Sequence, residues 1–283
     1  MFQYAIGRAL SLDRNEGLVI DKSYYDLIHK RATKRDYALS YFNLNVNLKE
    51  YWISNPMIVS ICMRFHQFLI RHIPSLFPHY VLEHTLKYDN TQFTNKEGNL
   101  YLDGYWQCEK YFSHHAEQIK SDFQIRIPQS EINQKWSKVI GNTCSVCLHV
   151  RRGDYVTNPD AAKCHGVLNG DAGLKYYHDA ISYITSKVQN PVFFLFSDDY
   201  EWVKDNLSVE YPVHYMDHNG PSEDYEDLRL MTHCKHFIIE NSSFSWWGAW
   251  LSEYEDKIVV CPQQWFKNPD METDIICDGW VKI

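Results

Sequence analysis

The chain has 283 residues, 45% of them hydrophobic, and a formal net charge of −8 at pH 7. This length is enough for two domains of ordinary size or one large one. The negative charge excludes a broad surface that neutralises nucleic-acid phosphates. An anionic ligand would therefore have to be bound by a few cationic side chains close to it. Charge screening over about 8 Å allows such a basic pocket to exist in an acidic protein. No run of about 18 apolar residues predicts a membrane span.

The first half of the chain has an irregular pattern of hydrophobic residues. A helix is predicted at residues 2–12, because Ala5, Ile6, Ala9 and Leu10 fall on one face. The other elements predicted here are a strand at 18–21, helices at 56–72 and 113–121, and a turn-rich loop at 89–104.

The second half predicts an alternation of strands and helices. The strands are expected at 144–150, 192–197, 213–216, 236–240 and 257–261. The helices between them are expected at 172–188, 199–207, 222–234 and 245–254. Such a βαβ series is typical of an α/β fold with a mostly parallel sheet.

The first predicted strand of this series ends abruptly in Arg151, Arg152 and Asp154. Ligands of open α/β sheets sit outside the carboxyl ends of the strands. Because a guanidinium group binds phosphate bidentately, two adjacent arginines suit a diphosphate. The alternative is a solvated surface turn.

Two further strands also end in polar residues. The strand at 192–197 is followed by Asp198 and Asp199, and the strand at 236–240 by Asn241, Ser242, Ser243 and Ser245. Hydroxyl and amide groups at the start of a helix add donors beside free backbone N–H groups. The alternative for both segments is simple helix capping. Taken together, the three strand ends predict a phosphate site.

Several chemistries lack their motifs. The sequence has no Gly-x4-Gly-Lys-Ser/Thr, Gly-x-Gly-x-x-Gly, His-Glu-x-x-His or Gly-x-Ser-x-Gly segment, which disfavours ATPases, dinucleotide oxidoreductases, zinc proteases and α/β hydrolases. Asp198 and Asp199 are adjacent, not alternate as in a metal-dependent glycosyltransferase. The eight cysteines include one close pair, Cys144 and Cys147, which a strand would direct to opposite faces. We expect free thiols and a reducing compartment.

Three segments resemble the signature motifs of the α-1,2-fucosyltransferases, glycosyltransferase family eleven. They are residues 149–155, 196–199 and 241–249, and further similarity extends to residues 1–5, 104–107, 165–167, 227–228 and 230–231. The resemblance implies a GT-B fold, with two Rossmann-like domains facing a cleft. Residues 1–140 would form the acceptor-side domain, and residues 141–283 the domain that binds GDP-fucose.

The resemblance also implies an activity: inverting transfer of L-fucose from GDP-fucose to the 2-hydroxyl of a galactose-terminated oligosaccharide or glycolipid. No cofactor and no metal are expected. Arg151 and Arg152 would hold the donor diphosphate, with His149, Asp198, Asp199 and the loop of Asn241, Ser242, Ser243 and Ser245 on the donor side.

Several residue roles stay open at this point. Asp154 either accepts the acceptor's proton or orients an arginine, and a neighbouring cation would weaken it as a base. His149 is either a satisfied buried histidine or a proton shuttle. Asp198 and Asp199 either bind the nucleoside or cap a helix. Tyr105, Trp106 and His165 are the acceptor-side candidates.

The chain departs from the family pattern at its N-terminus, which begins at Met1 without the usual glycine-rich turn. We therefore expect the first domain to lack its first strand. The alternative function is a non-catalytic nucleotide- or glycan-binding relative that lost turnover through this change. No signal peptide is recognised, so a bacterial enzyme of polysaccharide synthesis is expected in the cytoplasm, at the inner face of the membrane.

Overall fold

The computed structural model describes residues 1–22, 25, 37–44, 46–49, 61, 65, 68–70, 72–93, 96–168 and 170–283. Contacts within the chain divide it into two units. Unit 1 comprises Met1–Arg126 and Thr273–Ile275, and unit 2 comprises Ile127–Glu272 and Ile276–Ile283. The predicted helix at 56–72 falls largely outside the described residues. The functions expected for residues 1–140 and 141–283 stay predictions.

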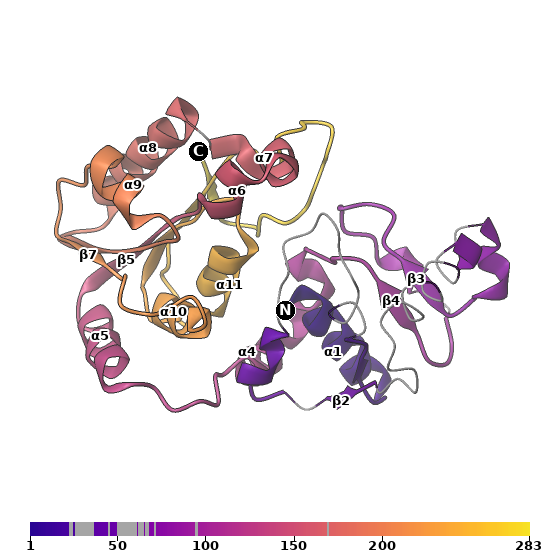
Figure 1. Ribbon diagram of the computed structural model, residues 1–283. Helices are drawn as coiled ribbons and strands as arrows, with labels where there is room; N and C mark the ends of the chain where they lie inside the picture. The colour runs from indigo at the N-terminus through magenta and orange to yellow at the C-terminus, as the bar shows by residue number, and fades with distance from the viewer. Residues whose placement is uncertain are drawn as a thin grey trace. The chain divides into compact units, whose positions relative to one another are not determined.

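Unit 2 is built on a six-stranded parallel sheet (Figure 1). Its strands are β5 (Cys144–Val150), β6 (Pro191–Ser197), β7 (Val213–Tyr215), β8 (His236–Ile238), β9 (Val259–Cys261) and β10 (Val281–Lys282). The order across the sheet is β10-β9-β8-β5-β6-β7. In chain order this is the 3-2-1-4-5-6 arrangement of doubly wound sheets, in which the direction of winding reverses between β5 and β8. The mixed α/β prediction with a parallel sheet is confirmed.

Helices connect the strands of unit 2. They are α5 (Glu131–Gly141), α6 (Gly153–Thr157), α7 (Pro159–His165), α8 (Asp171–Lys187), α9 (Tyr200–Asn206), α10 (Asp224–Thr232) and α11 (Ser243–Leu251), with a 3-10 turn, η6, at Gly166–Leu168. The four predicted helices match α8 to α11 within three residues at each end. The short helices α6 and α7 were not predicted.

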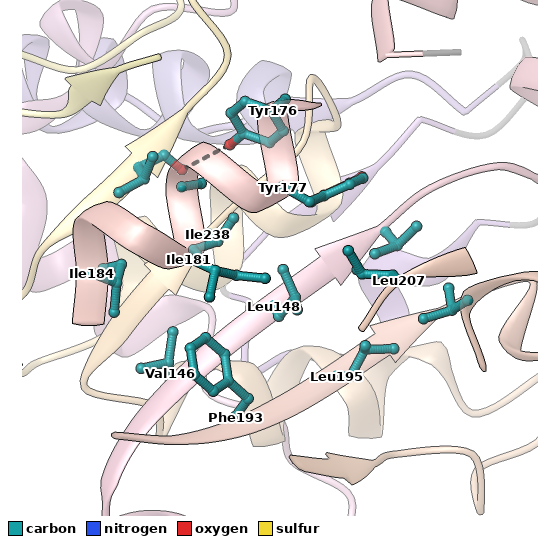
Figure 2. Packing of buried hydrophobic residues seen from close by; sticks show 14 of the residues in the cluster. Val146, Leu148, Tyr176, Tyr177, Ile181, Ile184, Phe193, Leu195, Leu207 and Ile238 are labelled. Carbon is teal, nitrogen blue, oxygen red and sulfur yellow. Dashed lines mark hydrogen bonds between the residues drawn. The ribbon is translucent and has the colours of Figure 1, made fainter. Parts of the chain in front are cut away.

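One face of the sheet packs against α8 (Figure 2). Val146 and Leu148 of β5 and Phe193 of β6 are fully buried against Ile181 and Ile184 of α8. These strand residues alternate along the chain, so they share one face. Burying each such side chain stabilises the fold by about 1.5–3 kcal/mol.

The opposite face of the sheet packs against α5, α10 and α11. Phe194 lies edge-on to Trp136 of α5, with ring centroids 6.3 Å apart. Helices α10 and α11 approach closely at Gly248, where a Cβ atom would lie 2.9 Å from Cβ of Met231. The two adjacent tryptophans of α11, Trp246 and Trp247, are buried. They form core and present no stacking surface.

Unit 1 contains smaller elements. Helix α1 (Phe2–Arg14) confirms the first predicted helix, and α4 (Ala116–Asp122) occupies much of the predicted helix at 113–121. The strands pair in parallel as β1 (Val19–Ile20) with β2 (Asn47–Leu48), and β3 (Tyr80–Leu82) with β4 (Tyr101–Asp103). The 3-10 helices are η1 (Ala38–Tyr41), η2 (Pro74–Leu76), η3 (Asn90–Gln92), η4 (Glu109–Tyr111) and η5 (Ser113–His115).

A buried polar contact joins α1 to α4 in unit 1. The Tyr4 hydroxyl donates to Asp122 Oδ2 over 2.7 Å, and Arg8 Nε donates to the same oxygen over 3.0 Å. Burial and the hydrogen bond to Asp122 raise the pKa of Tyr4, so it stays a neutral donor. Across the described residues of both units, no helix has the length and apolarity needed to cross a membrane.

Candidate functional site

The carboxyl ends of β5 and β6 lie side by side and bring the predicted arginines to the predicted aspartates. Val150 is in register with Ser197, so Arg151 follows one strand where Asp198 follows the other. Arg151 Nη1 lies 3.0 Å from Asp198 Oδ2. Arg152 Nε donates to Asp199 Oδ2 over 3.1 Å. The two strand ends are thus joined by ion pairs.

Asp198 and Asp199 have structural partners that the sequence did not specify. Asp198 Oδ1 accepts the backbone N–H of Arg152 over 2.8 Å. Asp199 caps α9, because its side chain accepts the backbone N–H of Trp202 over 3.2 Å. The capping interpretation therefore fits Asp199. Both carboxylates also fix the positions of the arginines.

Asp154 pairs with Arg151 through one oxygen. Asp154 Oδ1 accepts from Arg151 Nη2 over 2.7 Å and from Nε over 3.2 Å. Burial opposes the charge of Arg151, but Asp198 and Asp154 outweigh it and raise the pKa of the guanidinium above its usual value. Of the two roles left open for Asp154, this geometry favours orienting Arg151 over accepting a proton.

Arg152 is oriented by an aromatic ring that the sequence did not single out. Its Cζ lies 3.7 Å from the centre of the Trp202 ring, which is within cation–π distance. Trp202 sits in the first turn of α9, directly after the Asp199 cap. A tryptophan three residues after the Asp198-Asp199 pair was the available sequence signal.

The two arginines differ in how many N–H groups they have engaged. A guanidinium carries five N–H groups. Within the described residues, Arg151 uses Nε, Nη1 and Nη2 for carboxylates, whereas Arg152 uses Nε alone. The four Nη hydrogens of Arg152 thus remain for another partner. Three carboxylates surround the two guanidinium groups, so a diphosphate would also need neutral donors.

The end of β8 is tied to the end of β5 by a buried glutamate. The Glu240 carboxyl accepts the backbone N–H of Arg151 and, over 3.0 Å, the hydroxyl of Tyr177. Burial raises the pKa of Glu240 to about 8, although both hydrogen bonds oppose that shift. Sequence reasoning missed Glu240. The only signal for Glu240 in the sequence was its place as an acidic residue at the end of a predicted apolar strand.

The loop from Asn241 to Ser245 adds neutral polar groups at the same edge of the sheet. Asn241 Nδ2 donates to the carbonyl oxygens of His165 and Trp265, over 2.8 and 2.9 Å. Ser245 Oγ donates to Ser242 O over 3.3 Å. The Ser242 side chain makes no capping hydrogen bond to α11. The hydroxyl of Ser242 therefore does not satisfy the first N–H groups of that helix.

Tyr155 connects the arginine turn to this loop. The Tyr155 hydroxyl donates to Asn241 O over 3.1 Å. The Tyr155 ring stacks on His165, with centroids 5.2 Å apart and planes at 16°. His165, predicted on the acceptor side, therefore lies beside the loop that was predicted to hold the donor. Burial lowers the pKa of His165.

Three buried polar atoms near these strand ends have no hydrogen-bond partner in the part of the chain that the structure describes. They are His149 Nδ1, Asn241 Oδ1 and His165 Nδ1. Burial lowers the pKa of His149 to about 3, so its ring is neutral. His149 is buried as predicted, but it is not fully satisfied. Buried polar atoms cost free energy unless something bonds to them.

A second carboxyl of unit 2 titrates near neutrality. Burial and the neighbouring Asp224 and Glu223 raise the pKa of Asp227 to about 7, although a hydrogen bond from Asn219 opposes the shift. Asn219 Nδ2 donates to Asp227 Oδ1 over 2.8 Å, and Asn219 Oδ1 accepts from the buried Asn133 over 2.9 Å. The sequence offered Asp227 only as part of the family resemblance.

The two aromatic acceptor candidates of unit 1 have opposite environments. The Tyr105 side chain is exposed, whereas Trp106 is fully buried against Phe93 and Tyr111. Trp106 has no exposed ring face on which a sugar could stack, so its expected platform role is corrected to a core role. Glu83 holds this turn by accepting the backbone N–H groups of both residues, over 2.7 and 2.9 Å.

Comparison with known proteins gives consistent matches. The model of the family described as glycosyl transferase family 11 matches residues 76–283. The chain is 35% identical to an Escherichia coli alpha-1,2-colitosyltransferase, over all of this chain and 94% of that protein. It is 33% identical to the Escherichia coli O-antigen biosynthesis glycosyltransferase WbnK, over all of this chain and 96% of that protein.

More distant similarity extends to animal enzymes. Human galactoside alpha-(1,2)-fucosyltransferase 1 is 27% identical over 54% of this chain and 43% of that protein. A crystal structure of POFUT1 in complex with GDP-fucose matches with a TM-score of 0.30 and 11% identity, covering 90% of this chain and 87% of that chain.

Proposed function

Because the chain belongs to glycosyltransferase family 11, we propose that it transfers L-fucose from GDP-fucose to the 2-hydroxyl of a terminal galactoside, with inversion and without a catalytic metal. The chain is a glycosyltransferase related to α-1,2-fucosyl- and α-1,2-colitosyltransferases. The observation that carries the proposal is the pairing of β5, which leads into Arg151 and Arg152, with β8, which leads into the Asn241–Ser245 loop, at the point where the winding of the sheet reverses. The backbone N–H of Arg151 bonds Glu240, and Tyr155 bonds Asn241.

Arg152 is the proposed contact to the donor diphosphate. In the described part of the chain, the Trp202 ring and one carboxylate, that of Asp199, hold the guanidinium in place, and four of its N–H groups have no other partner. Negative charge grows on GDP as the fucosyl bond breaks. A fixed cation at that position stabilises the transition state more than the ground state. Arg151, with three of its nitrogens engaged by carboxylates, would shape the turn that presents Arg152.

The start of α11 is the proposed neutral half of the diphosphate site. The N-terminal N–H groups of a helix and nearby hydroxyls bind anions without adding charge. Ser242, Ser243 and Ser245 lie at this helix start, and the buried His149 Nδ1 has no hydrogen-bond partner among the described residues. Neutral donors also suit a site already crowded with carboxylates. Asp198 and Asp199 would reach the nucleoside only after exchanging arginine contacts.

For the acceptor, we propose the GT-B arrangement with the first domain on the acceptor side. Tyr105 is the exposed aromatic candidate for stacking on a sugar ring. The acceptor class is a galactose-terminated oligosaccharide or glycolipid.

A second donor is favoured by one observation. The Escherichia coli relative named alpha-1,2-colitosyltransferase is 35% identical over the whole of this chain. Colitose is L-fucose without its 3-hydroxyl. A site that hydrogen-bonds a substrate hydroxyl rejects the deoxy analogue strongly, whereas a site that does not bond it discriminates weakly. The preference between GDP-fucose and GDP-colitose therefore depends on whether the site hydrogen-bonds the 3-hydroxyl of the sugar.

The deciding experiment offers the purified protein GDP-fucose, GDP-colitose and, as a control, GDP-mannose, each with a β-galactoside acceptor and with or without EDTA. We expect an α-1,2-linked product from GDP-fucose, identified by NMR, with the same rate in EDTA. Product from GDP-colitose alone would show that the protein uses GDP-colitose and not GDP-fucose as its donor. GDP binding without product from any donor would support the non-catalytic alternative, and EDTA-sensitive transfer would contradict metal independence.

A further inference from the structure

A compact group of metal-binding side chains lies in unit 1, outside the residues proposed for sugar transfer. Asp13 lies near the end of α1, and His114 and His115 belong to η5. His115 Nε2 lies 2.7 Å from Asp13 Oδ1, and His114 Nε2 lies 3.1 Å from Asp13 Oδ2. One ligand atom from each residue falls within 4.8 Å of the other two. Two elements about a hundred residues apart in the sequence thus meet at three ligand atoms.

The orientation of the two histidines favours a shared ion. Consecutive residues of a 3-10 helix project about 120° apart. His114 and His115 nevertheless both turn their Nε2 atoms toward one carboxylate, with ring centroids 4.5 Å apart. Each ring contacts a different oxygen of Asp13. The three groups therefore converge on one point instead of spreading over the surface.

The spacing fits a small divalent cation. With Zn–N distances of about 2.0–2.1 Å, neighbouring ligand atoms of a tetrahedral site lie about 3.3 Å apart. The two N···O distances here are slightly shorter, as hydrogen-bonded pairs would be before an ion separates them. The side chains of His114, His115 and Asp13 are 48%, 28% and 42% exposed, so an ion from solvent can reach them.

The chemistry of the ligands selects the kind of ion. Imidazole nitrogen suits zinc, copper, nickel and cobalt, whereas magnesium and calcium prefer an all-oxygen site. Asp13 adds a carboxylate oxygen, which zinc also accepts as a ligand beside imidazole nitrogen. Three protein ligands leave a fourth position for water.

We infer that Asp13, His114 and His115 form a binding site for a divalent transition metal of the zinc type, which links the end of α1 to η5. The inference does not depend on the proposed sugar transfer, because it uses none of the donor-site residues. A bound ion would stabilise unit 1, since a ligand that binds only the folded state shifts the unfolding equilibrium. The competing account is a pair of histidine–aspartate contacts that bind no metal.

Calorimetric titration of the tag-free, full-length protein with zinc chloride tests the inference. Exposed Cys144 and half-buried Cys164 could bind zinc through their thiols, so both are replaced by serine in every sample. We expect one zinc ion per chain and a thermal midpoint that rises with zinc. His114→Gln, His115→Gln and Asp13→Asn should each weaken binding by about tenfold or more. His178→Gln, at an exposed histidine of α8, is the matched control and should bind as the parent does.

A second measurement needs no substitution of the ligands. Carbethoxylation of histidines, mapped by mass spectrometry, should be suppressed by zinc at His114 and His115 and unchanged at His178. No saturable binding, or equal affinity in the three ligand variants and the control, would overturn the inference. Protection spread equally over all exposed histidines would also overturn it.

Discussion

At the scale of single residues, Arg152 is the side chain on which the proposed chemistry depends most. Replacing it with alanine should lower kcat/KM roughly a hundredfold, about 3 kcal/mol of transition-state stabilisation, because charge-assisted hydrogen bonds to the leaving diphosphate are lost. Arg152→Lys should recover little, since lysine keeps the charge but neither the planar fork nor the same stacking on Trp202. Steady-state kinetics with varied donor measure both effects.

The control for this prediction is Lys175→Ala, which removes a cation whose side chain is 78% exposed on α8. It should leave kcat/KM unchanged. Activity of Arg152→Ala within about twofold of the parent would remove Arg152 from the donor site.

Glu240 makes a separate prediction about pH and stability. Its folded pKa of about 8 lies above the ordinary value of 4.5, so the folded state holds the proton more tightly than the unfolded state. The stabilising contribution is therefore complete below pH 4.5 and is lost as pH rises toward 8. Between about pH 5 and 8, the free energy of unfolding should fall more steeply in the parent than in Glu240→Gln. The difference should exceed ~1.4 kcal/mol, the equivalent of one pKa unit.

Urea unfolding followed by tryptophan fluorescence measures this difference, because most tryptophans lie in unit 2: Trp136, Trp202, Trp246, Trp247, Trp250, Trp265 and Trp280. Parallel pH dependences for the parent and Glu240→Gln would show that Glu240 is ionised in the folded protein and would contradict the burial argument.

The sequence identified the arginines and aspartates of the site but not their partners. Strand ends followed by charged residues were visible, so Arg151, Arg152, Asp198 and Asp199 could be grouped. Glu240 escaped notice because its function depends on the backbone N–H of Arg151, 89 residues earlier in the chain. The sequence also did not predict the burial of Trp106, because the rings of Phe93 and Tyr111 contact it only in the folded chain.

At the scale of elements, the start of α6 must lie very close to the end of β6. A Cβ atom on Gly153 would sit 2.2 Å from Asp198 Oδ2. Gly153→Ala should therefore displace Asp198, which holds both the Arg151 side chain and the Arg152 backbone. We expect a raised KM for the donor and a loss of about 1–3 kcal/mol in stability, as for other overpacked sites.

Gly141→Ala is the matched control for Gly153→Ala. Gly141 is the last residue of α5, and a Cβ atom added to it would point into open space, so alanine fits there. Donor KM, measured together with urea unfolding, should be unchanged in this variant. Equal donor KM in both variants would show that α6 does not need its close approach to β6.

Regular elements of unit 2 followed from hydrophobic patterning, and irregular ones did not. Strands β5 and β6 are long apolar runs, so their bounds were predicted within one residue. Helices α6 and α7 were missed because they are short and separated by one residue, Asn158, whose side chain caps α7. In unit 1, β3 and β4 have three residues each, too few for a period-two pattern, and β4 falls in a stretch predicted as loop.

At the scale of the whole molecule, the order of strands in the sheet determines which residues lie together at the proposed donor site. Sequence alone predicted parallel strands but not which strands are neighbours. Pairing of β5 with both β6 and β8 brings three strand ends together, although β8 begins 85 residues after Arg151. The chain has a net charge of −8, and the two arginines at the end of β5 are each held in an ion pair with an aspartate at the end of β6.

The most direct test of this account is a crystal structure of the protein with GDP bound. We predict the diphosphate at the carboxyl ends of β5 and β8, with Arg152 Nη atoms and the first N–H groups of α11 within hydrogen-bond distance of its oxygens. A diphosphate bound elsewhere, with Arg152 still paired only to Asp199 and stacked on Trp202, would contradict the central claim.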